Sequence, residues 1–110
     1  MKNISVLENR TPHAVKIVDN NGTLIKEFAP SGDIARLQPT TKVVGEVAGV
    51  PVTSTTYGEP IGLPEEKEGV GYIVSALLRT TLTQRGDLFS PGQLVRDDNG
   101  NVVGCKSLDH

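Results

Sequence analysis

The chain has 110 residues and a formal net charge of −2, with 11 basic and 13 acidic residues interspersed along it. The lack of a basic run or stripe argues against a binder of duplex nucleic acid. No apolar run approaches the ~18 residues of a membrane span, so no membrane partner is expected. The length predicts one domain over residues 1–110, with a radius of gyration of about 13 Å.

Strand patterns dominate the first third of the chain. Apolar and polar residues alternate over residues 3–8, 13–19 and 23–29. The last two runs flank the turn sequence Asn-Asn-Gly at 20–22. Asn-Gly favours a tight hairpin turn because both residues tolerate positive φ angles. We therefore predict a hairpin that pairs 13–19 with 23–29.

Two further extended segments follow a Pro-Ser-Gly turn at 30–32. They cover residues 34–49 and 50–60 and are joined at Gly49. Pro39 and Pro51 cannot donate a hydrogen bond to a sheet, so we expect them at strand starts, edges or bulges.

The second half contains a buried strand, one helix and a second hairpin. After a polar loop at 62–69, the apolar run 70–74 is typical of a strand buried on both faces. Ser75 is a good N-cap for a helix of about ten residues, with Arg85 in its last turn and Gly86 beyond it. Residues 94–108 predict a hairpin around Asn99-Gly100. The fold class expected is α+β: a mostly antiparallel sheet, curled or barrel-like, with one short helix.

Few residues suggest catalysis. A nucleophilic Cys105 would need His13 beside it, and the alternative is that Cys105 is a small core residue and His13 part of a turn. His110, the last residue, is expected to fray. A single cysteine excludes an internal disulfide and a multi-cysteine zinc site. The Asp-Asp-Asn-Gly run at 97–100 lacks the spacing of a calcium loop and predicts a turn. We expect no enzyme activity, no metal and no cofactor.

Arginines and hydroxyls give the strongest indication of a ligand site. Ser75 and Arg79, with Arg36 or Arg96, could hold a phosphate at the start of the helix, since arginine binds phosphate through two contacts. His13 completes this candidate ligand-binding set. In the alternative interpretation Ser75 is only a cap and the arginines make surface ion pairs. If Ser75 and Arg79 do hold a phosphate, replacing Arg79 by alanine should weaken binding and barely change stability, because exposed charges contribute little to it.

Short motifs are spread over nearly the whole chain: NRTPH (9–13), PSGDIAR (30–36), VGEVAGVPV (44–52), GLP (62–64), YIVS (72–75) and VRDDNGNVVGC (95–105). Through these motifs the sequence resembles a family of small uncharacterised phage- and prophage-associated proteins. It departs from the family pattern at Arg10, where an apolar residue is usual, and at Glu65–Lys67, where proline is common.

The resemblance implies a phage context rather than an activity. In that context one hypothesis is a non-catalytic, anti-defence protein that sequesters a phosphate-bearing nucleotide signal. The other is a structural or protein-interaction module, such as a virion accessory protein or a host-enzyme inhibitor. The short chain and its many strand edges predict a homo-oligomer. The unpaired thiol and the lack of an apolar leader segment predict a cytoplasmic location, the host cytoplasm if the chain is phage-encoded.

Overall fold

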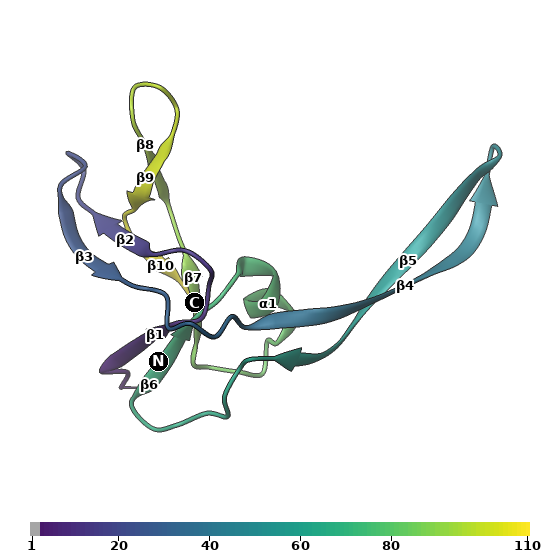
Figure 1. Cartoon of the computed structure of the whole chain (residues 1–110), viewed down its shortest axis with the longest axis horizontal. Coiled ribbons are helices and arrows are strands. Elements are labelled where there is room, and N and C mark those ends of the chain that lie inside the picture. The colour runs from purple at the N-terminus through teal and green to yellow at the C-terminus, as the bar shows by residue number, and fades with distance from the viewer. Residues whose placement is uncertain (1–2) are drawn as a thin grey trace.

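A computed structural model describes residues 3–110, which form strands and one short helix (Figure 1). In chain order the elements are β1 (Val6–Asn9), β2 (Val15–Val18), β3 (Leu24–Phe28), β4 (Arg36–Val47), β5 (Val50–Ile61), β6 (Val70–Ile73), α1 (Ala76–Thr81), β7 (Leu88–Pro91), β8 (Leu94–Arg96), β9 (Val102–Cys105) and β10 (Leu108–Asp109).

The first sheet holds the main core. Its strand order is β1-β6-β7-β10, with β6 parallel to both β1 and β7 and β10 antiparallel to β7. The sequence predicted β6 as a buried central strand, and this is confirmed: Tyr72, Ile73 and Val74 are at most 1% exposed. Leu78 of α1 and Leu88 of β7 pack with Tyr72 and Val74.

The second sheet has the order β3-β2-β9-β8. It contains both predicted hairpins, β2–β3 and β8–β9, which are antiparallel as expected. Gly22 and Gly100 have φ angles of 80° and 83° in the two turns, so both hairpins are confirmed, although the asparagine before each glycine does not take a positive φ. The central pair, β2 and β9, is parallel and joins Ile17 to Cys105.

The third sheet is a long two-stranded ribbon that projects from the rest of the molecule (Figure 1). Its strands, β4 and β5, have 12 residues each and are exposed along almost their whole length. Ala48 and Gly49, with φ angles of 51° and 80°, form the turn at its tip. Pro39 borders a register shift, in agreement with its predicted place at an edge or bulge. We call the β4–β5 hairpin the arm.

Helix α1 is shorter than predicted. The Ser75 hydroxyl accepts a hydrogen bond from the Leu78 amide at 3.2 Å, which confirms the N-cap, but the helix ends at Thr81. Thr80 and Thr81 turn their hydroxyls back onto the carbonyl oxygens of Ala76 and Leu77. Such bonds and β-branching disfavour a longer helix, so the predicted last-turn place of Arg85 is wrong.

The predicted fold class is correct in its coarse form and wrong in its finer form. The described chain is mostly strand with one short helix, as an α+β prediction requires. Its sheets are mixed rather than mostly antiparallel, and residues 3–110 contain no closed barrel. The shape also differs, because the radius of gyration is 17.0 Å instead of about 13 Å. The arm accounts for this extension (Figure 1).

A buried asparagine organises the segment between β1 and β2. Asn9 is 1% exposed, and its amide nitrogen donates to the carbonyl oxygens of His13 and Phe28 at 2.8 and 2.9 Å. Its amide oxygen accepts from the backbone nitrogen and the hydroxyl of Thr11 at 2.9 and 2.7 Å. The first and third residues of the Asn-Arg-Thr-Pro-His motif thus fix the loop through their side chains.

Candidate functional site

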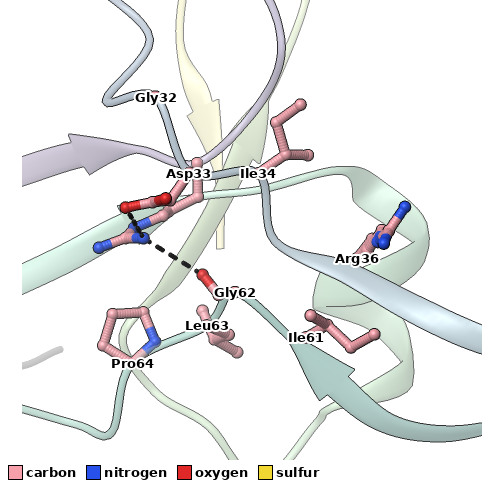
Figure 2. A pocket seen from close by; sticks show the side chains of 9 residues that line it. Gly32, Asp33, Ile34, Arg36, Ile61, Gly62, Leu63 and Pro64 are labelled. Carbon is pink, nitrogen blue, oxygen red and sulfur yellow. Dashed lines mark hydrogen bonds and ion pairs between the residues drawn. The ribbon is translucent and has the colours of Figure 1, made fainter.

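The largest pocket lies at the base of the arm and has a volume of about 670 Å³ (Figure 2). We call it the Arg36 pocket. The loop Gly32–Ile34 forms one wall, and the segment that follows β5 forms the other. Arg36, the first residue of β4, also lines the pocket. Its volume is in the range of small-molecule sites. The lining residues are Arg10, Gly32, Asp33, Ile34, Arg36, Ile61, Gly62, Leu63 and Pro64.

Arg10 ties the floor of this pocket to the core. Its guanidinium donates to Glu8 Oε2 at 2.9 and 3.2 Å and to the Gly62 carbonyl oxygen at 3.3 Å. A longer ion pair, 3.5 Å, joins it to Asp33, whose carboxylate is largely exposed. The guanidinium also lies 5.9 Å from the centre of the Tyr72 ring. Most donors of Arg10 are therefore occupied by the protein itself.

Arg36 differs from Arg10 in being uncommitted. It is exposed, and its side chain makes no hydrogen bond or ion pair with any residue in the range 3–110. Figure 2 shows its side chain on the opposite side of the pocket from Asp33. Of the two arginines that line this pocket, Arg36 is therefore the one whose guanidinium has no partner within residues 3–110.

A second, smaller cavity of about 290 Å³ contains two of the other predicted site residues. We call it the Ser75 groove. His13 and Ser75 lie on its wall together with Cys105, and the rest of its surface is mostly apolar. The lining residues are Thr11, His13, Ala14, Val15, Lys16, Val74, Ser75, Pro91, Leu94, Val102, Gly104 and Cys105.

Cys105 is a buried residue, as one of the two alternatives predicted. It is 2% exposed and its thiol lies 3.6 Å from the carbonyl oxygen of Lys16. Burial raises the pKa of the Cys105 thiol, which favours the neutral form over the nucleophilic thiolate. His13 shares the groove, but a catalytic cysteine needs surroundings that lower the pKa of its thiol, whereas burial raises the pKa of Cys105.

Arg79 and Arg96 lie elsewhere. Arg79 Nε donates to the hydroxyl of the buried residue Ser90 at 2.8 Å, and its side chain borders a different cavity near Arg85. Arg96 bonds the carbonyl oxygen of Gly100 at 2.9 Å within the β8–β9 hairpin. The five predicted ligand-binding residues are thus distributed over several places, and only His13 and Ser75 line one cavity.

Arg85, predicted at a helix end, takes part in a buried ion pair instead. Its guanidinium makes two hydrogen bonds, of 2.8 and 2.9 Å, to the carboxylate of Asp87, which is 1% exposed. A third bond reaches the carbonyl oxygen of Pro64 at 2.9 Å. The hydrogen bonds to Asp87 raise the pKa of Arg85. The predicted fraying of His110 is also wrong, since its ring lies 3.0 Å from the Gly86 carbonyl oxygen.

Sequence reasoning missed Arg10 and the exposure of the arm. The signal for Arg10 was the acidic residue Glu8, which lies two positions before it. Residues at i and i+2 of an extended chain lie on the same side, which makes Glu8 its natural partner. The arm carries no such signal, since a valine- and threonine-rich hairpin is equally suited to a buried sheet.

The described residues contain neither a cluster of metal ligands nor a membrane-spanning helix. No group of three or more potential metal-ligating side chains occurs among the described residues. Within 3–110 no helix has the length and apolarity of a transmembrane segment. Comparisons with protein-family models, with curated proteins and with solved structures gave no match.

Proposed function

We propose that this protein is a non-catalytic interaction module and that the arm is the element that binds another protein. The observation that carries the proposal is the exposure of the arm on both faces. A two-stranded ribbon is marginally stable in water without a third strand or a packing layer. A partner that covers the arm would supply that layer.

The composition of the arm favours a protein partner. Among residues 3–110, 15 large hydrophobic residues are exposed, and seven of them lie on the arm: Val43, Val44, Val47, Val50, Val52, Tyr57 and Ile61. Its charged residues are two basic and two acidic, namely Arg36, Lys42, Glu46 and Glu59. This balance gives no attraction for a phosphate backbone or an anionic membrane, whereas clustered apolar residues are typical of protein interaction sites.

A photo-crosslinking amino acid placed at Val44 or Val50 in the full chain tests this in the cells that make it. We expect discrete adducts of defined mass from both positions. The matched control is Ile25, which is 66% exposed but lies on β3, outside the arm. If the arm positions crosslink no more than position 25 does, the arm is not an interaction element and the proposal fails.

A phosphate-bearing ligand, such as a nucleotide, is a second candidate function, which the Arg36 pocket favours. The pocket combines an uncommitted guanidinium with apolar walls from Ile34, Ile61 and Leu63. Such walls suit a base or sugar, and the guanidinium suits a phosphate. The Asp33 carboxylate lies on the opposite side of the pocket from Arg36 and is paired with Arg10 at 3.5 Å.

Calorimetry with a panel of cyclic and linear nucleotides tests the second candidate. A charge-assisted bond of about 1.5–3 kcal/mol predicts a ten- to hundredfold weaker Kd for Arg36→Ala. Arg96→Ala, which removes an exposed arginine on β8, is the control and should bind as the wild type does. If no nucleotide in the panel binds, or if Arg36→Ala and Arg96→Ala bind with equal affinity, this candidate function is excluded.

A further inference from the structure

The chain exposes more surface than its mass requires. A compact monomer of 11.7 kDa exposes about 5,900 Å². This chain exposes 7352 Å², an excess of about 1,500 Å². A standard protein interface covers about 800 Å² on each partner. The excess is therefore large enough for a stable interface on every copy.

The apolar surface of the arm gathers at its tip. Val47 pairs with Val50 and Gly45 pairs with Val52, so these four residues lie on one face. Val44 stands in the bulge next to Gly45. We call Val44, Val47, Val50 and Val52 the valine tip, and their exposed fractions are 55, 65, 61 and 39%.

The Ser75 groove is a second apolar surface, which lies on the body of the same chain. Leu94 and Val102 line it and are 48 and 50% exposed, so apolar surface continues from the groove onto its rim. The two surfaces lie on separate parts of one chain, the groove beside β2 and β9 and the tip at the far end of the arm (Figure 1). A strand of 12 residues spans about 40 Å, which gives the tip a long reach.

Charge and edges both favour a second copy as the occupant. The two basic and two acidic residues of the arm balance, so the arm meets no net repulsion from the rest of a second copy, which carries the chain's net charge of −2. Pro39 on β4 and Pro51 and Pro60 on β5 interrupt the free edges of the ribbon. Prolines discourage the addition of further strands, so association would use the faces of the arm.

We propose that the valine tip of one copy seats in the Ser75 groove of a second copy, and that this contact holds the protein as a homo-oligomer. The inference rests on the proposed interaction function and adds its partner. If each of two copies places its arm in the groove of the other, the assembly is a closed dimer. If each copy places its arm in the groove of the next copy, the assembly closes into a ring.

The purified full chain tests this by light scattering and sedimentation over a range of concentrations. We expect a mass of at least two copies of the 11.7 kDa chain. Val50→Lys, which puts a charge into an apolar contact, should raise the dissociation constant at least about tenfold. Ile25→Lys changes an equally exposed residue outside both surfaces and should associate as the wild type does.

A disulfide test identifies the surface that receives the valine tip. Val50→Cys is mixed with Leu94→Cys under mild oxidation, and we expect a covalent dimer that joins positions 50 and 94. Val50→Cys mixed with Ile25→Cys should give no such product. The buried thiol of Cys105 stays in place, and the wild type serves as its control.

A wild type that stays at 11.7 kDa, a normal association of Val50→Lys, or a lack of the 50–94 crosslink would overturn the inference. These failures differ from a failure of the proposed function. A purified monomer whose arm crosslinks to another protein in cells would leave the interaction function standing and remove only the second copy. Equal crosslinking of arm and control positions in cells would remove both.

Discussion

Asn9 offers a direct test of how the segment before β2 is held. We expect Asn9→Ala to destabilise the protein more than any change at an exposed asparagine. The side chain makes four hydrogen bonds, to His13, Phe28 and twice to Thr11, while being 1% exposed. Its removal leaves partly buried backbone groups without partners, and such groups are costly where water cannot fully replace the lost bond.

The magnitude follows from counting the groups that lose their partner. The Thr11 hydroxyl has a single proton, so once the Asn9 side chain is gone it can donate to the His13 carbonyl oxygen, which lies 2.9 Å away. The carbonyl oxygen of Phe28 and the backbone amide of Thr11 lose their bonds from Asn9. Each costs about 1–3 kcal/mol when unsatisfied. Because the loop is only partly buried, we expect a total of about 2–4 kcal/mol.

Chemical denaturation monitored by circular dichroism measures the free energy of unfolding. Asn101→Ala is the control, since Asn101 is exposed and sits in the β8–β9 turn; its change should stay within about 0.5 kcal/mol. Thr11→Val, which removes one hydroxyl and keeps the shape, should cost about 1 kcal/mol. If Asn9→Ala lowers stability by less than the control range, the loop is held by other contacts and the reasoning is refuted.

Three further changes test other parts of the structure by the same denaturation assay. Arg85→Ala leaves the buried carboxylate of Asp87 unpaired and should cost about 3–5 kcal/mol, whereas the exposed Arg96→Ala should be nearly neutral. Gly62→Ala adds a Cβ that overlaps the Ile34 carbonyl oxygen at a φ of 76°, and we expect a loss of about 2–4 kcal/mol; Gly45→Ala, with open space around it, should change little. Burial raises the pKa of Cys105, so the folded state keeps its proton where the unfolded chain loses it, and stability should fall as pH rises above about 8.5. Cys105→Ala should abolish that slope, and an unchanged slope would contradict the assignment.

Local signals predicted the hairpins and the helix start well. The Asn-Gly pairs at 21–22 and 99–100 fixed two turns because few residues other than glycine take a positive φ without strain. Ser75 marked the helix start because a hydroxyl at that position satisfies an orphan amide. Each of these signals depends on contacts within a few residues of the chain.

The sheet order could not be predicted in the same way. The parallel pairing of β1 with β6 joins Val6 to Val70, and that of β2 with β9 joins Ile17 to Cys105. No turn connects such strands, so their pairing leaves no mark on the local sequence. The arm shows the same limit, because alternation specifies a strand but not whether another layer covers it.

The structure places the predicted arginines apart for a related reason, because their grouping depends on tertiary contacts, and Arg79 offers a test. The sequence alone predicts that Arg79 is exposed and that its loss barely changes stability. In the structure it is half-buried, and its Nε donates at 2.8 Å to the hydroxyl of Ser90, a residue with no exposed surface. We therefore expect Arg79→Ala to cost about 1–2 kcal/mol, since the buried hydroxyl would lose a charged donor. Gln84→Ala, an exposed change nearby, should be neutral. In a double-mutant cycle with Ser90→Ala, the cost of Arg79→Ala should shrink, because the partner is already gone. A coupling energy near zero would mean that the bond contributes nothing, and it would return Arg79 to the set of cations available to a ligand.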